Sequence, residues 1–534
     1  MAKLITVPNR QLMEATPYPY KENPPLWESH LNGGMVSTFD PENLDLKSAV
    51  ILKNMLTRFD HTSRRSGISL FTPAKPNANK ILGWFLYQKS DGSEKLVRLT
   101  KSTIHAASSG AWVALTGPAL VGTDNDRWRT TILEDRMFGT NNGANVIQEI
   151  DIGTNTYFNL GNAPKYKYIA GFGDRVVGFS LAGGVPVSNQ LGWSGNRNYA
   201  EWNPLVDQSA GSKVLTTSAS DVSDFGTGIF SFGPILVIIR EKSIWNATLK
   251  PVATDPFNTY QAVPNIGSDS PDSIAKCGVK GVAFLDTRTK STYLYGLDNS
   301  VNIFSDPIKN DLLSSISDPT LVFGCFNQAT NEYSICVPSV ISTVIKEWIF
   351  NFDTKTWSFS EYDNTSLITC LDFASGGITI DELIGSIDAL VGTIDQLAPG
   401  KSVAKFFGRT DGELLLEDRN VDLDNGVAYT SQFRSKDFQL PAFKRFVNRL
   451  HITYVPRFIS GNVTVEYSIN GGVSWVFWKT VTLVAGDLNT YKYLVCKKNI
   501  MTKRFTFRIT STAGQFELIE YAVFGDEAGE NVNK

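Results

Sequence analysis

The chain has 534 residues, of which 42% are hydrophobic, enough for several hydrophobic cores or one large repetitive domain. Its 32 Phe, 18 Tyr, 11 Trp and 43 Gly favour strands and turns over a helical bundle. The formal net charge of −3 argues against a protein that binds nucleic acid along its whole length.

The cysteines and the apolar segments indicate the cellular compartment in which the protein is made. Five cysteines, an odd number without a CxxC pair, predict buried free thiols rather than disulfides or a zinc site. They are Cys277, Cys325, Cys336, Cys370 and Cys496. The N-terminal stretch has no apolar core of signal-peptide length, and the longest apolar runs are too short to cross a bilayer. We expect a soluble protein without a membrane span, made in a reducing cytoplasm.

Residues 1–60 are predicted to form an extended arm. Five prolines at positions 8, 17, 19, 24 and 25 disfavour regular structure at its start. A short helix is expected from about Asp45 to Leu56. The Arg64-Arg65-Ser66-Gly67 turn follows, and then a strand from Ile68 to Thr72. An arginine pair can bind phosphate, but here we expect a solvated turn.

Residues 61–379 are predicted to form a β-propeller. The stretch Glu332 to Tyr362 reads as three strands joined by turns, and such a meander needs neighbours of its own kind to bury both faces. Strand-turn-strand units of this kind recur about every 40 to 56 residues. They begin at Lys95, Asn145, Val185, Leu236, Thr292 and Glu347. Six such units, give or take one, predict radial repetition that leaves only short, protected edges.

Residues 380–427 are predicted to be a repeat-containing excursion and connector. The run IDELIGS-IDALVGT-IDQL repeats seven residues nearly three times, and its apolar positions would form one stripe if helical. They are Ile380, Leu383, Ile387, Leu390, Ile394 and Leu397. Gly385 and Gly392 argue against one continuous helix. Two interpretations stay open: the stripe pins a loop onto the propeller rim, or it contacts a neighbouring subunit.

Residues 428–525 are predicted to form an antiparallel β-sandwich, followed by a polar tail, 526–534. Long alternating strands replace the propeller spacing here. The Asn470-Gly471-Gly472 turn is a strong hairpin signal. Its surroundings, SINGGVSW, resemble the Asp-box of sialidases, but one copy outside the propeller favours a structural hairpin.

We found no residues that predict catalysis or a cofactor. Four histidines lie in different segments without acidic or Cys partners at ligand spacing. No GxSxG elbow and no GxxxxGK[ST] loop occurs, and sequence cannot place a facing carboxylate pair for a glycosidase. We therefore predict no catalytic, cofactor-binding or metal-binding residues and no cofactor, and we do not expect the chain to be an enzyme.

The layout resembles the tail hub (packaged-DNA stabilisation) proteins of short-tailed bacteriophages and their nozzle or tubular relatives. The resemblance is carried by LNGGMVSTFDPENLDLKSAVILKN…RRSG, by LGWSGNRNYAEWNP with FGPILVIIREKSIWNATL, by the IDxLxG[ST] repeat and by the C-terminal sandwich. Large insertions seen in longer nozzle proteins are missing, and Ile stands at repeat positions where Trp is frequent. Hub versus nozzle therefore stays open.

The resemblance implies a structural virion protein of a phage tail, assembled in the host bacterial cytoplasm. Its partners would be copies of itself in a ring of six, portal and adaptor proteins, and tail fibres or spikes. The ring would continue the DNA channel, help to retain packaged DNA, and let double-stranded DNA pass without sequence-specific binding. The alternative is a propeller-based carbohydrate-binding protein or a glycan-degrading enzyme acting on the host surface. That alternative predicts carboxylates and aromatic side chains converging at one propeller mouth.

Overall fold

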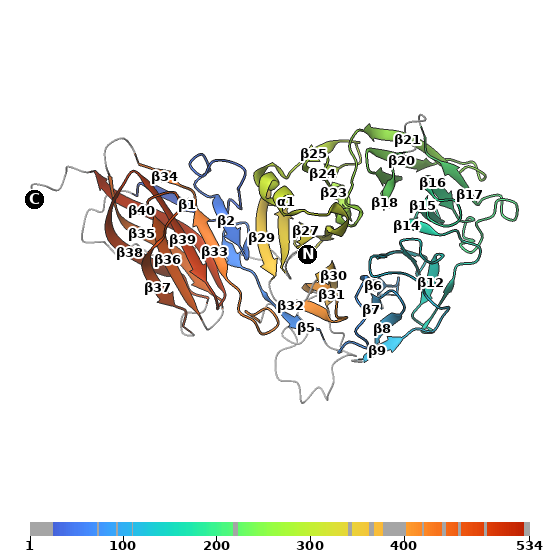
Figure 1. The fold of residues 1–534 in the computed structure, drawn as a ribbon, viewed down its shortest axis with the longest axis horizontal. Coiled ribbons are helices and arrows are strands. Elements are labelled where there is room, and N and C mark those ends of the chain that lie inside the picture. Colours follow the sequence, from blue (N-terminus) through green and yellow to red (C-terminus); the bar gives the residue numbers. More distant parts are fainter. Residues whose placement is uncertain are drawn as a thin grey trace, which may run out of the picture.

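The computed structural model describes residues 25–71, 74–91, 94–108, 111–216, 223–339, 344–362, 368–376, 402–418, 421–440, 445–457, 461–484 and 489–527. Within these residues the chain forms a ring of small sheets and, beside it, a larger two-sheet body (Figure 1). The predicted all-β fold, a propeller of about six blades with a C-terminal sandwich, is confirmed.

Five blades are continuous stretches of chain, each a four-stranded antiparallel sheet in sequential order. The first comprises β6 (Gly83–Gln88), β7 (Glu94–Leu99), β8 (Ile104–Ser108) and β9 (Ala111–Ala114). The second comprises β10 (Trp128–Leu133), β11 (Arg136–Asn141), β12 (Gln148–Asp151) and β13 (Thr156–Asn159). The third comprises β14 (Tyr166–Gly171), β15 (Val176–Leu181), β16 (Val187–Trp193) and β17 (Gly211–Val214).

The fourth and fifth blades follow the same plan. The fourth comprises β18 (Gly226–Phe232), β19 (Ile235–Arg240), β20 (Ser243–Leu249) and β21 (Phe257–Pro264). The fifth comprises β22 (Ala275–Lys276), β23 (Val282–Asp286), β24 (Ser291–Tyr295) and β25 (Val301–Ile303). Short helices lie around it: η2 (Pro271–Ser273), η3 (Gly278–Lys280), η4 (Asp306–Ile308), α1 (Lys309–Ser315) and η5 (Pro319–Leu321).

The sixth blade contains the three-stranded meander predicted from Glu332 to Tyr362. It comprises β26 (Phe323–Asn327), β27 (Glu332–Pro338), β28 (Ile345–Asn351) and β29 (Thr356–Tyr362). Trp348 and Trp357 are both buried, and Trp357 stacks on Phe304, which follows the fifth blade. Trp357 therefore packs against the neighbouring blade, whereas Trp348 contacts the ring of Phe359 in its own blade.

A seventh four-stranded sheet closes the ring, which brings the blade count among the described residues to the upper end of the predicted range. It comprises β30 (Ile368–Gly376), β31 (Ser402–Arg409), β32 (Leu414–Asp418) and, from the other end of the propeller sequence, β5 (Gly67–Leu70). Ile68, Phe407 and Leu415 share one buried cluster. Residues 402–418, predicted as connector, are thus propeller strands, because an outer strand 350 residues away completes their sheet.

The larger body is a sandwich of two sheets. One sheet runs β3 (Met55–Thr57), β4 (Thr62–Arg64), β40 (Phe516–Glu527), β35 (Arg445–Pro456) and β38 (Lys492–Thr502), with β1 (Trp27–His30) also paired to β40. The other runs β2 (Ala49–Lys53), β33 (Ser431–Ser435), β39 (Arg504–Ser511), β36 (Asn462–Ser468) and β37 (Val476–Thr482), with β34 (Phe438–Gln439) on β39. Their facing side chains belong to a large buried cluster that also includes residues of the fifth and sixth blades.

The described part of the N-terminal segment, from residue 25, belongs to this sandwich and does not form a separate arm. The helix predicted from Asp45 to Leu56 is wrong: β2 and β3 occupy that stretch. Val50 and Ile51 are β-branched, and β2 pairs with β33 more than 380 residues away. Pairing with a distant strand therefore decided that this segment is extended and not helical.

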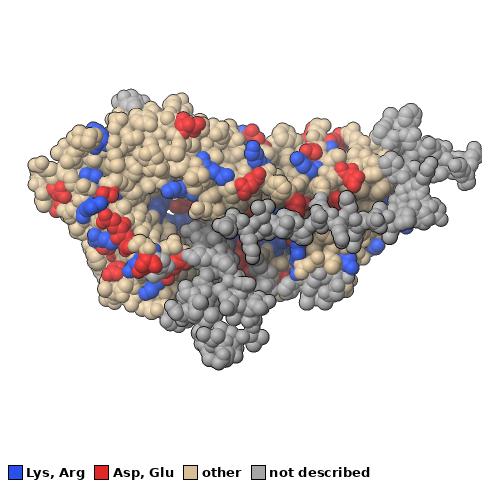
Figure 2. Space-filling model, turned by 180° about the vertical axis from the view of Figure 1, so that it is seen from behind, with Lys and Arg blue, Asp and Glu red and all other residues tan. Residues whose placement is uncertain are grey.

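One ten-stranded sheet connects the two bodies. It begins as the sixth blade and continues through β2 into the sandwich, where Lys53 of β2 is paired in parallel with Phe359 of β29. Lys, Arg, Asp and Glu side chains are interspersed over the face that Figure 2 shows, without a stripe of one sign. This pattern agrees with the small net charge.

Candidate functional site

The inner strands of six blades surround a cavity of about 470 Å³ in the propeller. β6, β10, β14, β18, β22 and β26 each contribute residues to its wall. The first strand of each blade faces the centre, so the cavity occupies the channel around which the blades are arranged. Such a channel is the usual place for a ligand in a propeller, so we take it as the candidate functional site.

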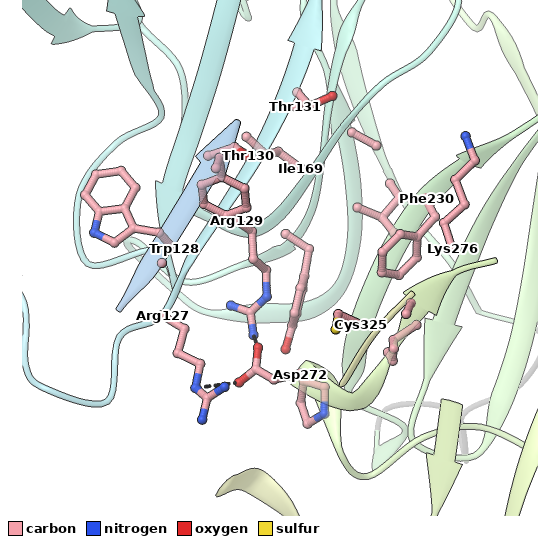
Figure 3. Close-up of a pocket in the computed structure, with 18 of the residues that line it drawn as sticks. Arg127, Trp128, Arg129, Thr130, Thr131, Ile169, Phe230, Asp272, Lys276 and Cys325 are labelled. Carbon is pink, nitrogen blue, oxygen red and sulfur yellow. Dashed lines mark hydrogen bonds and ion pairs between the residues drawn. The ribbon is translucent and has the colours of Figure 1, made fainter. Parts of the chain in front are cut away.

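The charged side chains of the cavity converge on one carboxylate. Asp272 lies between Arg127 and Arg129, with Arg129 Nη2 2.6 Å from Asp272 Oδ1 and Arg127 Nε 3.2 Å from Asp272 Oδ2 (Figure 3). Arg127 and Arg129 come from the start of the second blade, while Asp272 precedes the fifth. The bridge therefore ties two non-adjacent blades together across the channel.

Aromatic rings surround the two guanidinium groups. The Arg129 guanidinium lies 4.5 Å from the ring centre of Tyr168 in the third blade, and that of Arg127 lies 5.0 Å from the ring of Phe323 in the sixth. Burial acts to lower the pKa of Arg129, but Asp272 and Tyr168 outweigh it and the pKa is raised. Burial raises the pKa of Tyr168 to about 12. Contacts with the third, fifth and sixth blades thus hold the two guanidinium groups of the second blade in place.

The cavity lacks the carboxylate pair of a glycosidase. Its charged lining residues are Arg127, Arg129, Asp272 and Lys276, so a single carboxylate faces three cations. Most glycosidases cleave the glycosidic bond with two carboxyl groups that flank it. Of the two marks that the enzyme alternative predicts, the described lining offers aromatic side chains but no second carboxylate.

A second cavity, of about 600 Å³, lies where the propeller meets the sandwich. Its charges are largely paired: Arg58 with Glu332, Arg457 with Glu517, and Lys405 with Glu347 beside it. Burial acts to lower the pKa of Lys405, but the Glu347 carboxylate raises it well above its usual value. These ion pairs link the sixth blade, the seventh blade and the sandwich, which makes this cavity a structural junction.

The arginine pair Arg64-Arg65 belongs to the same junction, and the prediction that it marks a solvated turn is wrong. Arg64 is 4% and Arg65 2% exposed. Arg65 Nη1 donates to Asp424 Oδ1 at 2.7 Å, while Arg64 donates to the carbonyls of Gly514 (2.8 Å) and Tyr429 (2.9 Å). Both guanidinium groups lie over the Tyr429 ring. A charge pattern alone cannot distinguish a solvated arginine from one whose partners lie hundreds of residues away.

The structure separates the residues that sequence analysis had considered for chemistry. The candidate subunit-contact stripe lies outside the described residues; it comprises Ile380, Leu383, Ile387, Leu390, Ile394 and Leu397. The four histidines lie in different elements, and among the described residues no group of three or more His, Cys, Asp or Glu could hold a metal ion. Four cysteines, Cys277, Cys325, Cys336 and Cys496, are buried free thiols as predicted.

The Asn470-Gly471-Gly472 turn connects β36 to β37 as a hairpin, as predicted. Gly471 and Gly472 adopt φ of 69° and 82°, a region that favours glycine. Asn470 Oδ1 accepts a hydrogen bond from the Ser474 amide at 3.0 Å. The Asp-box-like sequence therefore serves the turn itself.

Sequence analysis missed the Arg127–Asp272–Arg129 bridge. Its members are 143 residues apart, and no motif joins them. The one available signal was the alternation of Arg127 and Arg129, which places both side chains on the same face of an extended segment.

Comparisons with known proteins show no family for this chain. No protein-family model and no curated protein matches the chain. Among solved structures, the extracellular domain of a protein described as a hybrid two-component system of B. thetaiotaomicron is 8% identical, with a TM-score of 0.38, over 80% of this chain and 47% of that chain. The chain therefore spans about half of that protein's length.

Two carbohydrate-binding modules are also similar over shorter stretches. A family 6 module is 8% identical with a TM-score of 0.15, covering 24% of this chain and 78% of its own. The module of a lichenase 5A from Cellvibrio mixtus, solved with cellotriose, is 14% identical with a TM-score of 0.15, covering 18% and 72%. Scores this low carry no argument about function. Among the described helices, none is long and apolar enough to cross a membrane.

Proposed function

We propose that this chain is a structural virion protein of a bacteriophage tail. Copies of it, six in number, form a ring that continues the DNA channel below the portal and adaptor proteins. The ring helps to retain packaged DNA and offers docking surfaces to fibres or spikes. The role is mechanical: rigid domains define the width of a channel through which DNA passes.

The buried arginine junction carries the proposal. Arg64 and Arg65 belong to the RRSG segment through which the chain resembles tail hub and nozzle proteins, and their partners lie in three parts of the molecule. They are Asp424 after the seventh blade, Tyr429 before the sandwich, and Gly514 within the sandwich. A scaffold needs domains that do not move relative to one another, and a buried junction whose hydrogen bonds reach several parts of the chain provides that rigidity.

The other resemblance motifs also serve folding. In the LGWSGNRNYAEWNP stretch, Trp193, Tyr199 and Trp202 are buried. In the stretch that ends in IWNATL, Arg240 is fully buried and its Nε and Nη2 donate to the Asp224 carbonyl. Motifs whose side chains fill cores rather than line a cavity support a structural protein over an enzyme.

Immunogold labelling of intact phage particles tests the proposal. We expect the label on the tail axis, below the head. Label on side fibres or in the capsid shell would contradict it. A purified protein that stays a monomer and releases sugar from host capsule would contradict it as well, and would favour the glycan-degrading alternative.

A further inference from the structure

The open edge of the sandwich exposes an unusual number of large hydrophobic side chains. Within 469–501 the described residues expose eight of them: Ile469, Val473, Val476, Phe477, Val484, Tyr491, Tyr493 and Met501. β37 and β38 are the last strands of their two sheets, and they meet here, with Lys479 Nζ donating to the Val495 carbonyl at 2.9 Å. We call β37, β38 and these side chains the basic edge, for the charge described next.

The same edge carries one sign of charge. Residues 476–484 and 489–503 contain five lysines and no carboxylate. They are Lys479, Lys492, Lys497, Lys498 and Lys503. Lysines on edge strands discourage indiscriminate strand pairing, which would account for the charge. They do not account for Phe477 on β37 and Tyr493 on β38, whose large rings are 60% and 70% exposed.

The loop between β16 and β17 has the complementary character. Its tip exposes Leu205 and Val206, which are 92% and 70% exposed, and Glu201 and Asp207 flank them. The side chain of Asn162 lowers the pKa of Glu201, and Ser209 lowers the pKa of Asp207, each by a hydrogen bond to the carboxylate. Both are therefore anions at neutral pH. We call residues 201–207 the acidic loop.

The charged side chains around the acidic loop also have a negative net charge. Arg197 Nε lies 3.5 Å from Glu134 Oε1 and 3.3 Å from Asp174 Oδ2. Burial lowers the pKa of Arg175, whereas the Asp174 and Asp207 carboxylates act to raise it. Arg136 also interacts with Glu134 and pairs with Glu149, so five carboxylates, including Glu201 and Asp207, face three guanidinium groups. The surroundings of the loop are thus negative, whereas the basic edge is positive.

The two surfaces lie at opposite ends of the molecule. β37 and β38 are at the left end of Figure 1, and β16 and β17 are at its right end. A surface that binds a different surface on the next copy forms a heterologous contact, and such contacts close into a ring when the rotation between copies closes. A contact of the basic edge with itself would bring like charges together.

We propose that the basic edge of one copy binds the acidic loop of the next. This inference rests on the proposed function, in which copies of the chain form a ring, and it assigns the contacting surfaces. Leu205 and Val206 pack among Phe477 and Tyr493, and lysines of the edge face Glu201 and Asp207. The occupant of the edge is a second copy of this chain.

Native mass spectrometry of the full chain and of two double variants tests the assignment. One variant is Phe477→Ser/Tyr493→Ser, and the other is Leu205→Ser/Val206→Ser. We expect the wild type to form closed rings and each variant to be a monomer. Val279→Ser is the matched control, since Val279 is 92% exposed but lies in neither surface, and it should form rings as the wild type does.

Mixing the two double variants gives a sharper result. Each variant keeps one intact surface, so a head-to-tail contact allows one pairing and no more, and we expect a dimer. Unchanged unfolding midpoints show that the variants are folded. Higher salt should weaken wild-type assembly, because the attraction is between exposed charges.

The outcomes distinguish this inference from the proposed function. Rings that persist in both variants, or a mixture that yields only monomers, would overturn the assigned surfaces and leave the ring intact. A wild type that is monomeric throughout would overturn both. A dimer formed by either variant alone would show a self-complementary contact and reject the head-to-tail arrangement.

Discussion

The sixth and seventh blades are built from similar strands in different ways. All four strands of the sixth blade lie between Phe323 and Tyr362, joined by short turns. The seventh takes three strands from Ile368–Asp418 and its fourth, β5, from the beginning of the propeller sequence. One blade is a local product of the chain, whereas the other exists only when distant segments meet.

This difference shows where the ring depends on long-range contacts. The sixth blade pairs Ile335 with Trp348, 13 residues later, whereas the seventh pairs Ile68 with Glu417. A contact between distant residues adds stability only after the chain between them has lost the conformational entropy of an open loop. The seventh blade and the arginine junction beside it are therefore where the fold is most sensitive to single changes.

Breaking the arginine junction should have the largest effect. Arg65→Met leaves the Asp424 carboxylate, which is 2% exposed, without its ion pair, and we expect unfolding free energy to fall by about 3–5 kcal/mol. Urea unfolding followed by tryptophan fluorescence measures it. Arg197→Met, at an exposed ion pair, is the control and should change stability by less than about 1 kcal/mol. An equal loss in both variants would contradict a special role for the junction.

A matched pair of isoleucines compares the two blades directly. Ile68 and Ile335 are both fully buried, so each substitution by Ala should cost about 2–5 kcal/mol. Ile335→Ala should also slow folding, because its contacts are local and form early. Ile68→Ala should chiefly speed unfolding, because its sheet forms late. Stopped-flow kinetics separates the two, and identical rate changes would mean that the blades form together.

Acid should weaken the contact between the first and seventh blades. His105 is the strand partner of Arg98, which donates a hydrogen bond to the Gly412 carbonyl of the seventh blade. Burial, and then Arg98, lower the pKa of His105 from 6.5 to about 4. The unfolded chain therefore binds this proton more readily, and stability present above pH 6.5 is lost as pH falls toward 4.

The loss from His105 should reach roughly 3 kcal/mol near pH 4. His105→Gln removes the titrating group, so the difference between variant and wild type should change in the variant's favour as pH falls. Urea unfolding at several pH values between 7 and 4 measures this. A difference that stays constant over that range would contradict the assignment.

The cross-channel bridge should contribute least of the four. Asp272 is partly accessible from the cavity, so Asp272→Asn should lower unfolding free energy by about 1.5–3 kcal/mol by weakening two charge-assisted hydrogen bonds. Thermal unfolding measures it. Asp298→Asn, in an exposed turn of the fifth blade, is a control with little expected effect. No loss at Asp272 would mean that the blades hold their positions without the bridge.

Sequence analysis predicted the local units well. Five of the six predicted strand-turn-strand units contain two paired strands of one blade, whereas Val185–Pro204 contains only β16; the Asn470-Gly471-Gly472 hairpin is in place. Alternating apolar residues and turn residues are local signals, so they survive without knowledge of the rest of the chain. Local signals could not predict most of the candidate site, because Asp272 contacts Arg129 only when the ring of blades is closed.

The sequence by itself determined that the chain is all-β, repeats a strand-turn-strand unit and ends in a different antiparallel domain, because strand periodicity and turn chemistry depend on neighbouring residues. The tertiary structure alone decided that Ala49–Lys53 is a strand, that Gly67–Leu70 closes the seventh blade and that Arg64 and Arg65 are buried. In each case at least one partner lies more than 290 residues away, and pairing with it outweighs the local preference.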